Sequence, residues 1–200
     1  MAYFQNSSLI GVVDITQVIT AGNVGSPWVS SSGALPAVTP EQMLGQIIEA
    51  QNSATIANLG GGGEFIFLKI PTSTTVTPGL FYSWKGDYTI SVVPTAVSSA
   101  AVSGFPIALA INTVASNGTL AQYTWFQVSG LGTAYRGSTT AVLAVNVPLF
   151  VSNVTAGKIR ATASIFRCII GIRSANTATI SAAISATPVY LQRPCIGPGV

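Results

Sequence analysis

The sequence predicts an all-β protein: an antiparallel β-barrel or sandwich that follows an extended N-terminal arm with one short helix. From residue 64 onward, short runs of β-branched and aromatic residues alternate with Gly, Pro, Asn and Ser turns, as in sandwiches and barrels. Residues 1–60 instead mix short apolar pieces with Gly, Ser and Pro. Four glycines, residues 60–63, separate the two parts. We therefore divide the chain into an arm, residues 1–60, and a β domain, residues 64–200.

The arm contains apolar residues that need cover from another surface. They lie among turn-forming residues and cannot build a core of their own. We therefore expect the arm to be the principal anchor to a partner. The alternative is that it folds back over the protein's own subunits. The anchoring residues that we expect are Tyr3, Phe4, Leu9, Ile10 and Trp28.

One short helix is predicted over residues 40–51. Thr39 is a suitable N-cap, Pro40 occupies the first helical position, and Gln42 completes a Thr-x-x-Gln capping box. The apolar stripe of this helix consists of Met43, Leu44, Ile47 and Ile48. The glycines that follow, residues 60–63, cost too much backbone entropy inside a regular element. They predict a hinge between the arm and the β domain.

The β domain is predicted to consist of short strands. These cover residues 64–70, 80–84, 88–93, 104–111, 123–130, 140–145, 148–152, 158–163 and 165–172. Residues 175–187 are ambiguous, because Ile180 and Ile184 have helical spacing while the Thr and Ala content allows a strand.

Two stretches of the β domain resemble each other. One begins at Val76 and the other at Val145, and each places a Pro before Leu-Phe-x-Ser, followed by a Gly turn and a further strand. As a repeat, they predict two similar β units stacked into one body. Independent use of the same turn chemistry is the alternative.

The stretch QYTWFQVSG, residues 122–130, has an aromatic residue on both faces of its predicted strand. Tyr123 and Trp125 alternate with Phe126, so one face holds the first two and the opposite face holds the third. Tyr and Trp side chains bury large areas and need cover. A second sheet or another subunit is required, and we expect Tyr123 and Trp125 to lie at or near a subunit interface.

The composition favours a protein that works in an assembly. Only 6% of the residues are charged, compared with about 25% in ordinary soluble proteins, so the surface is poorly protected against self-association. No acidic residue follows Asp87, and the second half is purely basic. Its basic residues are scattered, which favours an acidic protein partner over nucleic acid. No apolar run has the roughly 18–20 residues of a membrane span, and no secretory signal is expected.

Residues for catalysis are scarce. The chain has no histidine and only five acidic residues, so a His-dependent triad and His-assisted metal sites are excluded. Asp87 follows Gly86 and is predicted to bond the local backbone of a turn, and Glu64 is expected to begin a strand. We expect no enzyme activity, no cofactor and no metal. Cys168 and Cys195 are expected to be two reduced thiols, or else a disulfide that ties down the C-terminal tail.

Residues 64–176 resemble the decoration, or cement, proteins of tailed-bacteriophage capsids. The resemblance rests on EFIFLKI, LFYSW and FPIALAI, on a W-x-Q-V-x-G strand from Trp125 to Gly130, and on VPLFVS. It implies a β-barrel or tulip-like sandwich that binds as a homotrimer to the major capsid protein, outside the shell, and stabilises it. The protein would be made in the host cytoplasm and located on the capsid's outer surface. The chain departs from this pattern in its arm and in its low number of acids.

If the β domain and not the arm attaches to the capsid, its basic residues are the next candidates. They are Arg136, Arg160, Arg167 and Arg173. Alternative functions are a head-fibre, tail-associated or major shell protein, or a β-sandwich carbohydrate-binding module.

Overall fold

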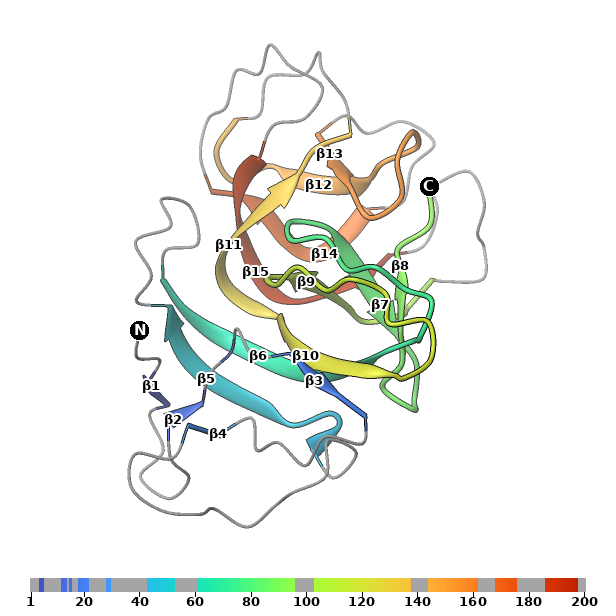
Figure 1. The fold of residues 1–200 in the computed structure, drawn as a ribbon. Coiled ribbons are helices and arrows are strands. Elements are labelled where there is room, and N and C mark those ends of the chain that lie inside the picture. Colours follow the sequence, from blue (N-terminus) through green and yellow to red (C-terminus); the bar gives the residue numbers. More distant parts are fainter. Residues whose placement is uncertain are drawn as a thin grey trace.

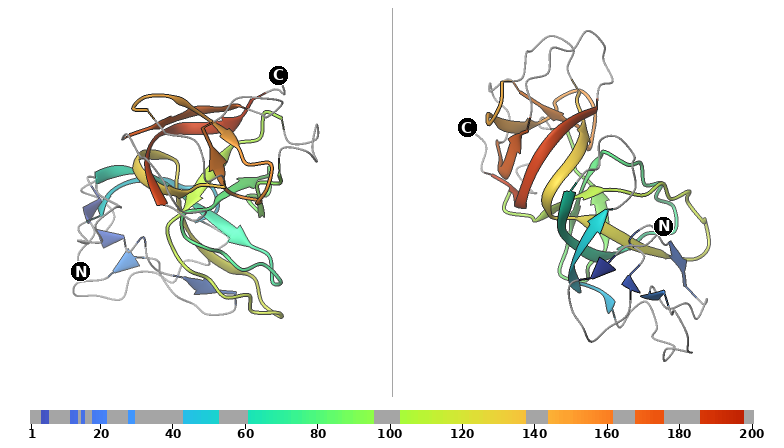
Figure 2. Two further views of the ribbon diagram at one scale, coloured as in Figure 1. Left: turned by 90° about the horizontal axis from the view of Figure 1, so that it is seen from above. Right: turned by 90° about the vertical axis from the view of Figure 1, so that its left-hand side faces the viewer.

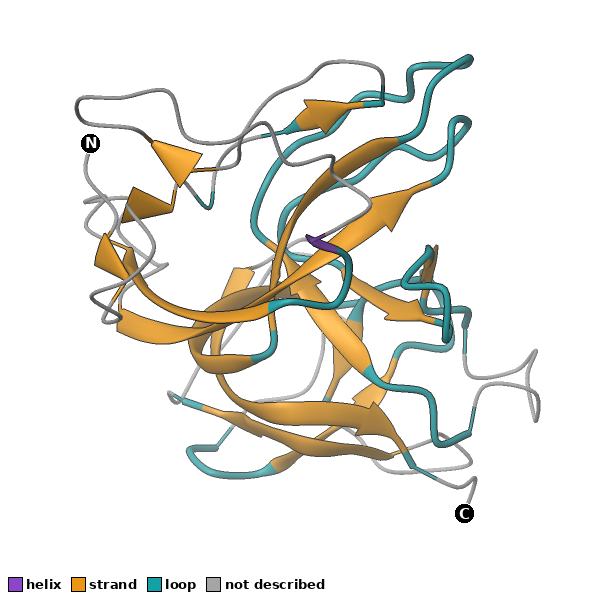
Figure 3. Cartoon of the chain, turned by 90° about the horizontal axis from the view of Figure 1, so that it is seen from below, coloured by secondary structure: helices purple, strands orange, loops and turns teal. Residues whose placement is uncertain are grey.

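The computed structural model confirms the expected fold class (Figure 1). It describes residues 4–5, 12–13, 15, 18–21, 28–29, 43–52, 61–95, 103–137, 144–161, 168–175 and 186–197. In these residues the regular elements are β-strands, apart from one 3₁₀ residue at Met43 (Figure 3). The pairs of named strands are antiparallel, and they form two large sheets and one small ribbon.

The first sheet has the order β1-β5-β6-β10-β9-β7-β8, and β3 pairs with β10 outside this path. Its strands are β1 (Phe4–Gln5), β3 (Ile19–Thr20), β5 (Ile47–Asn52), β6 (Gly61–Ile70), β7 (Phe81–Trp84), β8 (Ile90–Val92), β9 (Ile107–Ala110) and β10 (Gln122–Gln127). The second sheet has the order β11-β15-β14-β12-β13. Its strands are β11 (Ser129–Tyr135), β12 (Pro148–Val151), β13 (Ile159–Arg160), β14 (Cys168–Ser174) and β15 (Ala186–Ile196). The small ribbon pairs β2 (Val12–Val13) with β4 (Trp28–Val29).

The chain contains two five-stranded units with the same topology. Unit 1 consists of β6 to β10 and unit 2 of β11 to β15, and in both the spatial order is first, fifth, fourth, second, third. A parallel bridge closes each unit near its first and third strands, between Lys69 and Thr89 in unit 1 and between Arg136 and Ile159 in unit 2. The two similar sequence stretches form the equivalent hairpins β7–β8 and β12–β13. The stacked pair of units predicted from the repeat is therefore present.

Each unit has an inner face and an outer face. In unit 1 the inner face carries Tyr82 and Phe126, which belong to one apolar cluster, whereas Phe81 points to the outer face. In unit 2 the hairpin residue that matches Tyr82 is Val151, which lies on the inner face. The inner faces of both units are therefore equivalent, and so are the outer faces.

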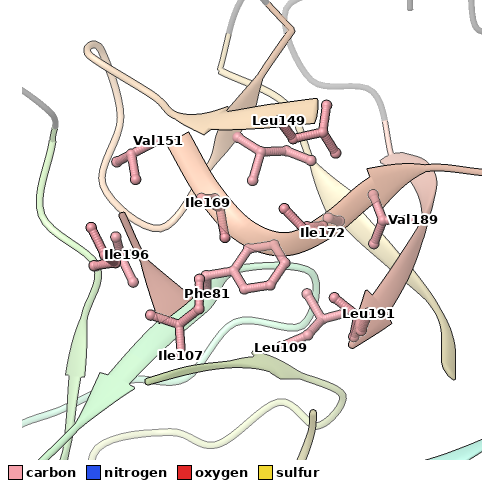
Figure 4. Close-up of a cluster of buried hydrophobic side chains, with 13 residues drawn as sticks. Phe81, Ile107, Leu109, Leu149, Val151, Ile169, Ile172, Val189, Leu191 and Ile196 are labelled. Atoms are coloured by element: carbon pink, nitrogen blue, oxygen red, sulfur yellow. The ribbon is translucent and has the colours of Figure 1, made fainter. Parts of the chain in front are cut away.

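The two units stack with the inner face of unit 2 on the outer face of unit 1. Phe81, Ile107 and Leu109 of unit 1 enter the cluster formed by the inner face of unit 2. Figure 4 shows the Phe81 ring in the middle of this cluster, among side chains from both units. The outer face of unit 2 is left without an equivalent cover from the described residues.

The remainder of the outer face of unit 1 is covered by residues that precede it in the sequence. This second cluster contains Phe65, Phe67, Tyr123 and Trp125 of β6 and β10. The covering residues are Ile15, Ile19, Met43, Ile48 and Ala50. Figure 2 shows these N-terminal strands on the side of unit 1 away from unit 2. We call the described residues up to 52 the N-terminal segment.

The predicted helix over residues 40–51 is wrong in its described part, residues 43–52. Residues 47–52 form β5, which pairs with β6 along its length from Ile47 opposite Ile66 to Asn52 opposite Gly61. Ile48 and Ala50 are buried while Ile47 and Glu49 are exposed, which is the alternation of a strand. The edge of β6 offers backbone partners to every residue of β5, and this outweighs the capping and periodicity signals.

The predicted glycine hinge is also wrong for residues 61–63, which begin β6. Here β6 crosses β11 at a distance that only glycine allows. A Cβ atom on Gly63 would lie 2.0 Å from the Ser129 carbonyl oxygen, and one on Gly130 would lie 2.2 Å from the Gly62 carbonyl oxygen. The glycines are therefore required for close packing of the two units rather than for flexibility.

Strand β15 lies in a segment where no strand was expected beyond residue 187. It pairs with both β11 and β14 although it contains Pro188 and Pro194. Pro194 follows Arg193, whose φ of +44° marks an irregular position where the register with β14 shifts. Of the strand expected over residues 140–145, residues 144–145 lie in no strand, and the others lie outside the described residues.

Candidate interaction surface

The outer face of unit 2 exposes an apolar and basic row of side chains. Leu131 of β11 lies opposite Tyr190 of β15, Tyr190 opposite Arg173 of β14, and Arg173 opposite Pro148 of β12. Residues directly opposite each other in antiparallel strands share a face. We call these four residues the outer row. Tyr190 is 55% exposed, which is unusual for a tyrosine in a central strand.

A further apolar side chain lies beside the outer row. Ile170 of β14 is 54% exposed and lies in register opposite Cys195. Gly171, with a φ of +79°, breaks the regular alternation after it, so that Ile172 returns to the inner cluster. Ile170 therefore adds an exposed apolar side chain to β14, the strand that also carries Arg173.

The Arg173 side chain is held in place by the turn that precedes β12. Its Nη1 donates a hydrogen bond to the Asn146 carbonyl oxygen at 3.0 Å. Asn146 has a φ of +63°, a conformation that Asn tolerates better than most residues, and its N–H donates to the Ser174 carbonyl oxygen at 2.9 Å. The guanidinium is exposed but positioned, so it can bind an acidic partner with little loss of side-chain entropy.

A second arginine near the outer row is engaged within the chain. Arg193 forms an ion pair with Glu64 across the two units. The hydrogen bond from Arg193 lowers the pKa of the Glu64 carboxyl, and the same bond raises the pKa of Arg193. Glu64 is thus engaged in a structural ion pair, whereas the exposed guanidinium of Arg173 bonds a backbone carbonyl oxygen.

The other predicted arginines are placed differently. Arg136 is only 1% exposed, and burial lowers the pKa of its guanidinium. Its prediction as a surface contact is wrong, because it follows β11 where the chain bridges to Ile159 and closes unit 2. Arg160 is half-buried and its Nη1 donates to the Asn153 Oδ1 atom. Arg167 lies outside the described residues.

The predicted subunit-interface residues are part of the protein's own core. Tyr123 and Trp125 are 1% and 0% exposed, and both stack or tilt against the Phe67 ring. The N-terminal segment covers them, so neither side chain has surface left for a second subunit. This corrects the prediction of Tyr123 and Trp125 as interface residues.

The arm residues predicted to contact a partner are only partly described. Phe4 lies in β1, which pairs with β5, and Trp28 lies in β4, which pairs with β2. Tyr3, Leu9 and Ile10 lie outside the described residues. The described backbone of the arm thus adds to the protein's own sheets.

Asp87 and the two cysteines are the remaining side chains for which the sequence predicted a role. The Asp87 turn is confirmed: its carboxylate accepts hydrogen bonds from the Thr89 N–H at 3.1 Å and the Thr89 hydroxyl at 3.0 Å, and these bonds lower its pKa. Cys168 and Cys195 are both free thiols, and burial raises the pKa of Cys168. The described ranges contain no group of three or more His, Cys, Asp or Glu residues that could hold a metal ion.

Nothing in the described part of the chain forms a helix long and apolar enough to cross a membrane. No protein-family model, curated protein or solved structure matches this chain.

The sequence analysis did not predict the outer row, although the strand β15, which carries Tyr190, has a recognisable sequence pattern. In residues 186–192, Thr187, Val189 and Leu191 point inward and alternate with more exposed residues. That is the period of a half-buried strand. The prolines at 188 and 194 hid it, because proline normally argues against a central strand.

Proposed function

We propose that the chain is a structural protein of a bacteriophage virion that binds the outside of the capsid as a trimer and stabilises the shell. The motifs that resemble capsid decoration proteins suggest this function. The outer row carries the assembly part of the proposal, because it combines an exposed aromatic residue, Tyr190, with a positioned cation, Arg173, on a broad sheet face. Aromatic and arginine side chains are the residues that contribute most at protein interfaces.

The charge distribution supports a protein partner. Residues 88–200 contain no Asp or Glu, so an acidic protein surface meets no repulsion on this side of the molecule. The basic residues do not form the dense track that a phosphate backbone requires. The proposed partners are the major capsid protein and further copies of the chain, with no nucleic acid or membrane.

A decoration protein needs a broad contact surface and several binding sites, and it does not need a catalytic centre. Several moderate contacts, repeated by the symmetry of the shell, act together through their effective concentration. The low share of charged residues, 6%, is compatible with a protein that functions in the assembled state. We place the protein on the outer surface of the virion.

The test is co-sedimentation of the purified protein with capsids that lack it, prepared from a phage whose copy of the gene is deleted. We expect saturable binding and a higher temperature of shell disruption in decorated particles. A protein that neither sediments with the shells nor changes their stability would contradict the proposal. Glycan-array binding in its place would support the carbohydrate-binding alternative.

A further inference from the structure

The outer face of unit 2 is the structural equivalent of the face that the N-terminal segment covers in unit 1. Phe67 lies opposite Trp125 on the first and fifth strands of unit 1. Leu131 lies opposite Tyr190 on the first and fifth strands of unit 2, again on the outer face. The two cross-strand pairs lie on corresponding strands and on equivalent faces of two units with one topology.

The two equivalent pairs differ in burial. Phe67 and Trp125 are both 0% exposed, because side chains of the N-terminal segment such as Ile48 pack on them. Tyr190 is more than half exposed, and the described residues supply no such layer over it. Unit 2 therefore offers the kind of surface that this protein covers with an extended segment elsewhere.

The N-terminal segment and unit 2 have opposite charge. Residues 1–60 contain Asp14, Glu41 and Glu49 and no Lys or Arg. Residues 129–200 contain six Lys or Arg residues and no Asp or Glu. The basic residues of unit 2 would therefore attract a covering segment with the acidic composition of residues 1–60.

One side of β5 is already used and the other is free to make contacts. Ile48 and Ala50 point into the cluster on unit 1, whereas Ile47 is 46% exposed and Glu49 is exposed. The outward side of β5 thus presents an aliphatic side chain next to a carboxylate. This matches the aromatic ring of Tyr190 beside the guanidinium of Arg173.

We infer that the outer row of unit 2 binds the outward side of the N-terminal segment of a second copy of this chain. Ile47 of one copy packs against Tyr190 of the next, and Glu49 pairs with Arg173. The two surfaces are different, so the contact is head-to-tail and closes into a ring when the rotation between copies allows it. The inference rests on the proposed function only for the number of copies in that ring.

The test is sedimentation velocity of the full chain over a wide range of concentration. Arg173→Glu and Glu49→Arg each place like charges across the contact, and each should raise the dissociation constant about tenfold or more. The double variant, Arg173→Glu with Glu49→Arg, should restore most of the association. Lys85→Glu is the matched control, because Lys85 is exposed in the β7–β8 turn and belongs neither to the outer row nor to β5.

The contact would be established if the double variant regains association and the Lys85→Glu variant associates as wild type does. A wild-type chain that stays monomeric, or an oligomer indifferent to both single changes, would overturn the inference. So would single variants that dissociate without rescue in the double variant. Tyr190→Ser is the second probe, because it leaves the charges intact. It should weaken association, and its melting temperature should equal that of wild type at concentrations where both proteins are monomeric.

Shell binding is measured separately with the same proteins. Absence of shell binding by wild-type protein that self-associates through these residues refutes the proposed function and leaves the inference intact. Shell binding by a wild-type protein that does not self-associate supports the proposed function and refutes the inference.

Discussion

Glu64 and Arg193, 129 residues apart in the sequence, join the two units by a bidentate ion pair. The Arg193 Nη2 lies 2.6 Å from Glu64 Oε1, and Arg193 Nε lies 2.9 Å from Glu64 Oε2. Their backbones meet at the same place, because the Val128 N–H donates to the Glu64 carbonyl oxygen at 2.8 Å and the Arg193 N–H donates to the Val128 carbonyl oxygen at 2.7 Å. Val128, the residue between β10 and β11, thus connects the sheets of both units.

This ion pair predicts a pH-dependent contribution to stability. The pKa of Glu64 is lowered from its ordinary value of 4.5, mainly by the hydrogen bond from Arg193. A lowered pKa means that the contribution is complete above pH 4.5 and is lost as the pH falls through the folded-state pKa. We expect Glu64→Gln to be less stable than wild type at neutral pH and equal to it in strong acid, as measured by urea unfolding.

The effect on stability is expected to be small, because the Arg193 side chain is largely exposed to solvent. The control is the same substitution in an Arg193→Gln background, where Glu64→Gln should no longer change the stability at any pH. A difference that persists in this background would show that Glu64 acts through some other group.

The crossing of β6 and β11 predicts that Gly63→Ala destabilises the protein. The added methyl group would meet the Ser129 carbonyl oxygen, which belongs to the backbone and cannot move aside cheaply. Overpacking of this kind costs about 1–3 kcal/mol of unfolding free energy. Gly86→Ala is the control, since a Cβ there meets nothing within 4 Å. Equal urea midpoints for both variants would contradict the close approach of the two units.

Trp125→Ala should lower stability without changing association. Trp125 is fully buried under the N-terminal segment, and truncation of such a residue costs about 3–5 kcal/mol. We expect the melting temperature to fall by the same amount at every protein concentration, compared with wild type at that concentration. A loss of stability that disappears at high protein concentration would instead place Trp125 at a subunit interface.

Asn112 is expected to hold the N-terminal segment on unit 1. Its Nδ2 donates to the Ile15 carbonyl oxygen and to the Thr124 Oγ1, both at 2.8 Å. Asn112→Ala leaves a buried carbonyl without this donor, which costs about 1–3 kcal/mol. Amide hydrogen exchange should accelerate at residues 18–21 more than in unit 2. Asn117→Ala is the control, because Asn117 bonds only its own exposed turn among the described contacts; equal exchange in both variants would refute the role of Asn112.

Local rules explain which parts of the fold were predictable. The strands of the β domain alternate with Gly and Pro turns, and the Asp87 turn depends on atoms two residues apart. The repeat was visible because both hairpins use the same Leu-Phe-x-Ser core strand. The outer row was harder to predict from the sequence. Its residues come from four strands, and the local sequence of a strand does not specify which strands become its neighbours.

The sequence by itself determined the all-β class, most strand positions and the two-unit plan, because alternation and turn chemistry act over a few residues. Tertiary structure decided the state of residues 47–52, where helical capping signals yielded to the open edge of β6. It also decided the role of the glycines at 61–63, which look flexible in isolation and are required where β11 crosses them. In both places a strand from elsewhere in the chain supplies the backbone contacts, and packing against it outweighs the local preference.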